Sequence, residues 1–483
     1  ICIWIYEEKS LSHHTPARFK RKKETIMSKL RYHIAVMAAK FSKVIIRLSG
    51  RNGTHTPGVV ARKICPDFMA QAPKAPLCIC VTGTNGKTTV SNMLTDMLEK
   101  EGKKVVSNRT GSNIVPGCVT NLLNSVNWLG RCRVDATVFE VDERASRLIL
   151  PYVKPDYLVV TNLFRDSLKR NAHPDYIFSV IDTYCPDTTK LILNADEQCS
   201  SNLKPNSEHV YFGIGKQDDD KTEPYNLIAD YTLCPKCGTK LKFNYLRYHH
   251  IGNAYCPNCD YKSADADYLA TKVDKEGKKL IVREKDGNEI EYALIHDALF
   301  NIYNELTVIT MMRELGYSSD EVKKRIAEIH VPESRYSETK VGNVTVVQAL
   351  SKGQSAVSSC RTFEYVAEEP GKKVIMIAED DFSDRQKSIE FIGWIYDLEY
   401  EQFARDDVMQ VVCCGPRCLD HRVRALIAGI PEEKIAWDLD EVAAVDKVKL
   451  EGVDKVYILY DCDTYGISCK MKQKLLKRLE DEK

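Results

Sequence analysis

A glycine-rich run with a lysine is the clearest chemical feature of the 483-residue chain. An apolar segment that ends at Val81 leads directly into Thr82-Gly83-Thr84-Asn85-Gly86-Lys87-Thr88-Thr89. Glycines let a backbone turn its N–H groups toward phosphate oxygens, and a helix N-terminus adds partial positive charge. Lys87 would reach the β- and γ-phosphates, and the Thr88 hydroxyl suits Mg²⁺. The strict Walker A spacing fails because Val81 occupies its first glycine position, and a plain strand-to-helix turn is the alternative.

Two Cys-x-x-Cys pairs form a second candidate site. Cys234 and Cys237 are separated by 18 residues from Cys256 and Cys259. Two such pairs at this spacing are typical of a zinc site. Four thiolates complete a tetrahedron and leave no open coordination position, so the zinc would be structural. Redox-active or unpaired cysteines are the alternative.

Further side chains lie between and around the two pairs. We expect His249 and His250 to be surface residues rather than metal ligands. Basic and aromatic residues in the same segment could stack on nucleic-acid bases, although aromatics also fill the core of a small module, which is the interpretation we favour. These residues are Lys240, Lys242, Arg247, Lys262, Tyr245, Tyr248 and Tyr255.

Alternating strands and helices are expected to position the glycine-rich run. Apolar residues recur with helical spacing after the run, and short buried-strand patterns occur on both sides of it. Strands that alternate with helices predict an α/β fold with parallel sheets. The predicted strands are 77–81, 134–139, 157–161, 191–193, 344–350, 374–378, 408–413 and 456–460. The predicted helices are 90–98, 298–315 and 319–329.

The chain divides into segments of different character. Residues 1–26 are expected to be a non-native or disordered leader, since a basic run follows an apolar one, the reverse of a signal peptide, and Met27 is a better start. An N-terminal segment covers 27–75. An ATPase domain covers 76–333 and contains an insert at about 223–270 with both cysteine pairs. A C-terminal α/β domain covers 334–483.

Composition excludes some classes of protein. The formal net charge is +1, so no global field attracts the chain to nucleic acid or membrane. The 18 cysteines are not spread through a short frame, and several lie in apolar runs where cysteine acts as a small hydrophobe, which fits a reducing cytosol. We find no apolar run of about 18 residues and expect no membrane span.

The glycine-rich run resembles the ATP loop of Mur ligases and folylpolyglutamate synthetases. The resemblance implies that Gly83, Thr84, Asn85, Gly86, Lys87, Thr88 and Thr89 bind the nucleotide and that Glu140, with Thr88, binds the catalytic Mg²⁺. Thr161-Asn162-x-x-x-Asp166 resembles the motif Thr-Asn-x-x-x-Asp-His, with Ser167 in place of the histidine. Nucleotide contacts are further implied for Asn301, Asn304 and Arg335, and the family's Leu-Asn-Ala-Asp stretch is matched by Leu193–Asp196.

A four-cysteine insert after a short N-terminal segment is similar to the layout of the MurT family of Mur-type ligases. That resemblance implies ATP, Mg²⁺ and Zn²⁺ as cofactors and a place in the cytoplasm at the inner face of the membrane. It implies amidation of the α-carboxylate of D-glutamate in the lipid II stem peptide, through an acyl phosphate. The ammonia would come from a GatD-like class I glutaminase, since this chain lacks the Gly-x-Cys-x-Gly elbow of such enzymes.

The C-terminal region departs from the family pattern. MurT proteins place an aspartate shortly before a tryptophan, and that aspartate is thought to assist the glutaminase. Here Phe391 stands three residues before Trp394, so Asp384 and Glu390 are the candidate acids, with solvated loop charges as the alternative; Lys352–Gln354 replaces the usual Lys-Asn-Pro. Two other functions stay open: a Mur-like ligase for another carboxylate and amine, and a zinc-ribbon ATPase that acts as a binding module.

Overall fold

The computed structural model describes residues 17–50, 52–109, 112–166, 173–329, 336–351, 355–380 and 392–481. Side chains are described from Met27 onward, apart from that of Tyr336. Several residues singled out in the sequence lie outside these ranges: most of the expected leader (1–16), Ser167, Arg335, Lys352–Gln354, Asp384, Glu390 and Phe391.

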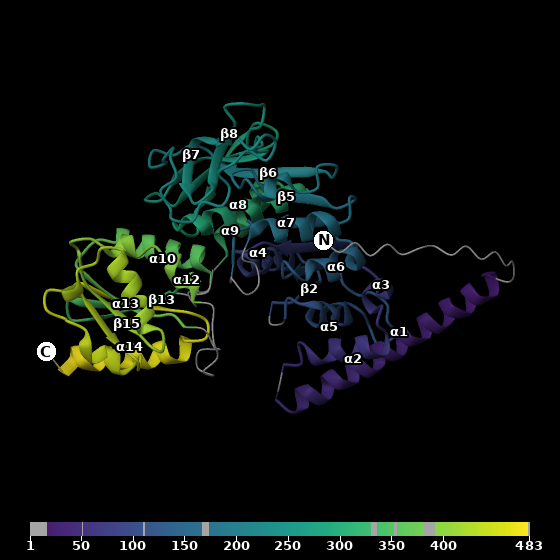
Figure 1. The fold of residues 1–483 in the computed structure, drawn as a ribbon. Helices are drawn as coiled ribbons and strands as arrows, with labels where there is room; N and C mark the ends of the chain where they lie inside the picture. The colour runs from purple at the N-terminus through teal and green to yellow at the C-terminus, as the bar shows by residue number, and fades with distance from the viewer. Residues whose placement is uncertain are drawn as a thin grey trace, which may run out of the picture.

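A nine-stranded sheet forms the centre of the larger α/β body (Figure 1). Its strand order is β11-β10-β9-β6-β5-β4-β1-β3-β2. The pairs from β2 to β9 are parallel, and β10 and β11 extend the sheet in antiparallel fashion. The strands are β1 (Leu77–Thr82), β2 (Val105–Ser107), β3 (Ala136–Glu140), β4 (Tyr157–Val160), β5 (Lys190–Asn194), β6 (His209–Ile214), β9 (Tyr268–Asp274), β10 (Lys279–Arg283) and β11 (Glu289–Ala293).

Helices cover both faces of this sheet, because alternate strand residues point to opposite sides. Ile79 and Val81 of β1 pack in one core with α4 and α8, whereas Cys78 and Cys80 pack in the opposite core with α5 and α6. The buried cysteines therefore act as small apolar residues, as predicted. The helices are α1 (Ala17–Leu48), α2 (Thr56–Ile64), α3 (Phe68–Gln71), α4 (Lys87–Lys100), α5 (Val115–Ser125), α6 (Ser146–Val153), α7 (Pro174–Tyr184), α8 (Leu299–Glu314) and α9 (Ser319–Ala327).

The C-terminal body has a six-stranded sheet of order β12-β13-β17-β14-β15-β16. All its pairs are parallel except β12 with β13. Helices α10, α12 and α13 pack on one face, and α14 packs on the other. The elements are β12 (Tyr336–Val341), β13 (Val344–Leu350), β14 (Lys373–Ala378), β15 (Val408–Cys414), β16 (Ile435–Asp438), β17 (Lys455–Tyr460), α10 (Ala356–Glu368), α12 (Gly393–Tyr396), α13 (Cys418–Ile427) and α14 (Tyr465–Asp481).

A small module carries the two cysteine pairs and rests against both bodies. Its antiparallel strands β7 (Lys242–Tyr248) and β8 (Ile251–Tyr255) form a separate sheet. The Glu399 carboxylate of the C-terminal body accepts hydrogen bonds from Asn226 Nδ2 at 3.0 Å and from Leu227 N at 2.9 Å. The Arg361 guanidinium lies 4.5 Å from the centre of the Tyr248 ring. The module therefore links the two bodies.

Every strand and helix predicted from the sequence is present, with ends shifted by a few residues. The α/β fold with parallel sheets is confirmed. Strands β2, β6–β12 and β16 were not predicted. In β9–β11, polar and charged residues interrupt the apolar ones. Among the described residues, no helix is both long and apolar enough to cross a membrane.

Candidate active site

The glycine-rich run forms a tight loop between β1 and α4. Gly83 has φ 125° and Gly86 has φ 88°, in the left-handed region that favours glycine. A Cβ on Gly83 would lie 2.3 Å from Thr161 Oγ1, and a Cβ on Gly86 would lie 2.2 Å from Asn304 Oδ1. Both glycines are therefore required by conformation and by space.

Residues after β4 hold this loop in place. Asn162 Oδ1 accepts from Asn85 N at 3.0 Å, and Asn85 O accepts from Thr161 Oγ1 at 2.6 Å and from Asn162 Nδ2 at 3.1 Å. Thr84 N donates to Asn162 O at 2.8 Å. The Thr-Asn pair of the sequence motif thus fixes the loop backbone, a role that a surface position would not require.

Lys87, the first residue of α4, points back over the loop. Its ammonium contacts the carbonyl oxygens of Gly83 and Thr84 and lies 2.8 Å from Glu143 Oε1. Burial of the ammonium disfavours its charge, but the neighbouring Glu143 carboxylate outweighs this and raises the pKa of Lys87. A charged lysine is therefore held at the mouth of the loop.

Glu140 ends β3 at the same edge of the sheet. Its backbone is fixed by Asn108, which accepts from Glu140 N and donates to Glu140 O, both at 2.7 Å. Its half-buried carboxylate accepts from Asn113 Nδ2 at 3.2 Å. Carboxyl ends of parallel strands are where α/β sheets bind ligands, and Glu140 occupies such a position beside β1.

Helix α8 closes the other side of the loop. Asn304 is buried against Gly86, and its Nδ2 lies 3.5 Å from Asn301 Oδ1. The structure therefore brings the loop, Glu140, Asp166 and the two asparagines to one region, with Asp166 close enough to contribute to the raised pKa of Lys87. Arg335 lies outside the described residues.

The four paired cysteines converge on one point. Their Sγ atoms all lie within 4.8 Å of one another, with Cys234–Cys259 at 3.6 Å and Cys237–Cys256 at 3.5 Å. Sulfurs bound to one tetrahedral zinc at about 2.3 Å lie about 3.8 Å apart, so the cluster has the right size. Backbone N–H groups of Lys236 and Asn258 donate to Cys234 and Cys256 at 3.4 Å each, as expected for tight metal-binding turns.

The expectation that His249 and His250 are surface residues is wrong. Each is only 1% exposed. His249 Nδ1 lies 2.9 Å from Ile228 O, and His250 Nε2 lies 3.0 Å from Glu197 Oε1. Both histidines pack between the module and the large sheet, where buried imidazoles need hydrogen-bond partners. Neither belongs to the cysteine cluster.

Asp196, at the end of the Leu-Asn-Ala-Asp stretch, anchors the module. Its carboxylate accepts from Tyr245 at 2.9 Å and from Arg247 at 3.2 Å, both on β7, and from Tyr303 of α8 at 2.8 Å. The basic and aromatic residues Tyr245, Arg247 and Tyr248 are all buried. They fill the module's contact with the sheet, which favours a packing role over stacking on nucleic-acid bases.

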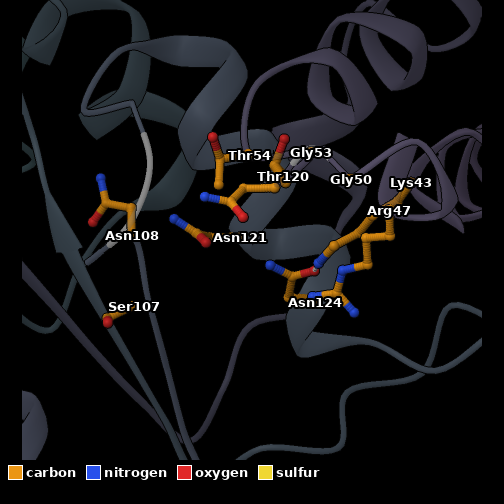
Figure 2. A pocket seen from close by; sticks show the side chains of 11 residues that line it. Lys43, Arg47, Gly50, Gly53, Thr54, Ser107, Asn108, Thr120, Asn121 and Asn124 are labelled. Carbon is orange, nitrogen blue, oxygen red and sulfur yellow. Dashed lines mark hydrogen bonds between the residues drawn. The ribbon is translucent and has the colours of Figure 1, made fainter. Parts of the chain in front are cut away.

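A cavity of about 420 Å³ has Asn108, which also binds the backbone of Glu140, in its wall (Figure 2). It contains two cations and four amide side chains but no carboxylate. Burial, and then the charges of Arg47, Lys40 and Arg133, lower the pKa of Lys43 to about 8. Figure 2 shows Lys43, Arg47 and Asn124 converging at one end. The lining residues are Lys43, Arg47, Gly50, Asn52, Gly53, Thr54, Ser107, Asn108, Thr120, Asn121 and Asn124.

Sequence reasoning missed Glu143 and Asn108. Glu143 lies three residues after Glu140 in an acidic run just past a strand end, which was a usable pattern. Asn108 acts through the backbone of a distant strand, and nothing in the sequence marks that pairing.

A Glu143→Gln substitution tests the ion pair with Lys87. The side chains of Lys87 and Glu143 are 13% and 4% exposed. Loss of the carboxylate therefore leaves the buried Lys87 ammonium unpaired, which should lower the free energy of unfolding by about 1–3 kcal/mol. Phosphate in the loop would replace the missing negative charge. We therefore expect ADP to raise the Tm of Glu143→Gln more than that of the unaltered chain. Exposed Glu99→Gln on α4 is the control; equal shifts in all three proteins would contradict the argument.

Comparison with known proteins agrees with this geometry. The Mur ligase middle domain matches residues 81–256, and the MurT ligase C-terminal domain matches residues 354–465. The lipid II isoglutaminyl synthase (glutamine-hydrolyzing) subunit MurT of Staphylococcus aureus (strain COL) is 26% identical over 405 residues, 83% of this chain and 89% of that protein. The corresponding subunit of Streptococcus pneumoniae (strain ATCC BAA-255 / R6) is 25% identical over 452 residues, 93% and 98% of the two chains.

A solved structure shows the same fold. A pseudomurein peptide ligase type C from Methanothermus fervidus superposes with a TM-score of 0.65 at 17% identity, over 85% of this chain and 79% of that one. The fold is that of the Mur ligases, and the middle-domain match supports an ATP-dependent ligase. The C-terminal match and the relatives over most of the chain's length make it similar to the MurT subunits.

Proposed function

We propose that this chain is the ligase subunit of a lipid II isoglutaminyl synthase. It would use ATP to amidate the α-carboxylate of D-glutamate in the lipid II stem peptide. The observation that supports this most directly is the loop with Lys87 and Glu140 at one sheet edge, in a chain whose relatives are named for that reaction. It would act in the cytoplasm at the inner face of the membrane, where the lipid substrate is anchored.

The chemistry follows from the poor leaving ability of a carboxylate oxygen. A carboxylate oxygen of the acceptor attacks the γ-phosphorus of ATP, the bond to ADP breaks, and an acyl phosphate forms. Ammonia then attacks the acyl carbon, loses a proton, and displaces phosphate to give the amide. Lys87 neutralises charge on the transferred group, and the loop N–H groups orient the phosphates.

The residues fit the proposed cofactors. The glycines leave no room for a Cβ and turn the loop backbone as a phosphate cradle requires. Thr88 and Glu140 would hold Mg²⁺, which would supply further neutralisation of the phosphoryl oxygens. The four thiolates would hold a structural Zn²⁺ with no open position for chemistry.

We assign the cavity of Figure 2 to the anionic part of the acceptor. Lys43 and Arg47 supply positive charge there without a carboxylate to compete. Asn108 joins the cavity wall to the backbone of Glu140, so a ligand in the cavity lies beside the proposed reaction edge. The diphosphate of lipid II has the chemistry that this lining would bind.

The ammonia would come from a GatD-like glutaminase that docks on the C-terminal body. Asp384 and Glu390, the candidate acids for assisting it, lie between Asp380 and Trp394. Both of these flanking residues contact α13: Arg417 N, at the start of α13, donates to Asp380 at 3.3 Å, and the Trp394 and His421 rings are 5.9 Å apart. Helix α13 also exposes a stripe of apolar side chains: Leu419, Val423, Leu426 and Ile427. We propose that this α13 stripe receives the partner.

The isolated chain should amidate lipid II with concentrated ammonia but not with glutamine, and a class I glutaminase should restore glutamine use. The double variant Leu419→Gln/Ile427→Gln should weaken partner binding at least tenfold, because a few central residues carry most of the binding energy of an interface, at about 1 kcal/mol or more each. Its ammonia-dependent rate should stay unchanged. Glutamine-dependent amidation by the chain alone would contradict the two-subunit proposal.

The two candidate acids can be separated in the same assay. A large loss with glutamine but not with ammonia in Asp384→Asn or Glu390→Gln would identify the acid that serves the glutaminase, since added ammonia bypasses that step. No loss in either variant would mean that the glutaminase carries its own complete set of catalytic groups.

A further inference from the structure

Helix α1 exposes a continuous apolar stripe. From Met27 onward, large apolar residues recur at alternating spacings of three and four, which places them on one face of a helix. All are exposed, with Phe41 at 62% and Leu48 at 83%. Figure 1 shows α1 along the outer edge of the large body, with its N-terminal half projecting beyond the other elements. The α1 stripe comprises Met27, Leu30, Ile34, Met37, Phe41, Val44 and Leu48.

The stripe is separate from the face that attaches α1 to the body. Tyr32, Ala35, Val36 and Ala39 are buried and pack in the core with α2, α3 and α5. Tyr32 OH also donates to Gly130 O at 3.2 Å. The stripe therefore does not serve the fold of the described chain, and apolar surface of this extent marks an interaction site.

The charged residues of α1 indicate which kind of surface the stripe binds. Between Thr25 and Leu48, α1 carries Lys and Arg but neither Asp nor Glu. Lys29, Arg31 and Arg47 are exposed, and Lys40 and Lys43 are half-buried. A helix with an apolar face and basic flanks lies in the plane of a membrane surface, with its apolar side chains among the lipid tails and its cations at anionic headgroups.

The loop beside α1 adds a second apolar contact. Trp128 is 53% exposed and Leu129 is 66% exposed. The loop is fixed to the helix because Lys40 Nζ donates to Val126 O at 2.8 Å and lies 5.9 Å from the centre of the Trp128 ring. Tryptophan is enriched at the boundary between lipid tails and headgroups.

We propose that the α1 stripe, its basic flanks and the Trp128–Leu129 loop form a docking surface for an anionic lipid bilayer. A second copy of the chain is the competing occupant, because spacings of three and four also occur in coiled coils. In a paired helix, however, the flanking positions Arg31, Lys40 and Arg47 would find no acid on the facing α1 to form the interhelical salt bridges that stabilise coiled coils. An anionic surface supplies the negative charge that a second copy lacks.

The inference goes beyond the proposed reaction and does not depend on the identity of the acceptor. If the proposed function holds, docking of α1 on a membrane has one further consequence for the acceptor. Lys43 and Arg47 belong to α1 and also line the cavity assigned to the acceptor diphosphate, so docking would bring a lipid-linked headgroup to that cavity.

Flotation with vesicles tests the proposal without ATP, acceptor or partner. The full chain should bind phosphatidylglycerol-rich vesicles, bind neutral phosphatidylcholine vesicles much more weakly, and lose affinity as salt is raised. Ile34→Gln/Phe41→Gln should lower the partition coefficient more than tenfold, since each side chain would lose its burial in lipid. Lys29→Gln and Arg31→Gln should each lower it about fivefold.

The variant Leu419→Gln/Ile427→Gln is the matched control, because it removes exposed apolar residues from α13 instead and should bind vesicles normally. Equal binding by the α1 and α13 variants would overturn the proposal, as would no binding of the unaltered chain to anionic vesicles. If the unaltered chain self-associates in sedimentation experiments and Ile34→Gln/Phe41→Gln does not, the stripe binds a second copy of the chain instead. Failure of the proposed reaction can be distinguished from failure of membrane docking. In that case the chain would bind vesicles but would form no amide from a lipid-free acceptor with ammonia.

Discussion

Replacement of Lys87 or Glu140 by alanine is expected to lower the rate of ATP-dependent turnover by about 10²–10³-fold while leaving the fold intact. Lys87 supplies positive charge at the mouth of the loop, and Glu140 would hold Mg²⁺ at the adjacent strand end. Neither side chain is part of an apolar core. Steady-state ADP release with saturating ATP and acceptor measures the effect.

Matched variants separate charge from general disturbance. Lys100→Ala removes a lysine from the far end of α4, where the side chain is 35% exposed and pairs with Glu328 at 3.6 Å. It should retain nearly full activity. Glu140→Gln keeps the size of the side chain and should be as impaired as Glu140→Ala if charge is what matters. Near-normal turnover by Lys87→Ala or Glu140→Ala would refute the role assigned to that residue.

Loss of the four-cysteine site is expected to have the largest effect on stability. Purified chain should contain one zinc, and a structural zinc contributes on the order of 10 kcal/mol in small zinc domains at neutral pH. Cys256→Ser should lose the zinc and unfold the module, seen as a lower Tm and faster amide exchange in β7 and β8. Nucleotide binding should be less affected, because the loop lies in another part of the sheet.

Unfolding of the module should next loosen the elements that Asp196 connects to it. Tyr245 and Arg247 of β7 bind Asp196, which also binds Tyr303 of α8, so exchange should next increase in α8. Cys462→Ser removes an exposed cysteine outside the cluster and should change neither zinc content nor Tm. Zinc-free protein with four freely titratable thiols and an unaltered Tm would contradict the structural role.

The elements of the fold were predictable where one physical pattern dominated. Buried parallel strands such as β1 and β4 read as continuous apolar runs, and the helix after the loop showed clear amphipathic spacing. The cysteine pairs were predictable because metal ligation constrains spacing directly. Strands β9–β11 were missed, because charged residues alternate with or interrupt their few apolar residues, so no continuous apolar run marks them.

The candidate site was predictable in its loop and its strand-end carboxylate, but not in its supporting contacts. Glu143 pairs with Lys87 across 56 positions of sequence, and Asn108 fixes Glu140 across 32. Such pairings depend on strand order, which a single sequence does not specify. The two histidines were misjudged for the same reason: only the docking of the module on the large sheet buries them.

Transfer of oxygen from the acceptor carboxylate to phosphate tests the central claim most directly. Lipid II labelled with heavy oxygen in the D-glutamate α-carboxylate is incubated with the chain, ATP, Mg²⁺ and ammonia. If the carboxylate attacks the γ-phosphorus, each amide formed releases a phosphate that carries one labelled oxygen, and mass spectrometry detects it. Release of ADP with unlabelled phosphate, or at the same rate without acceptor, would contradict activation of the carboxylate by ATP.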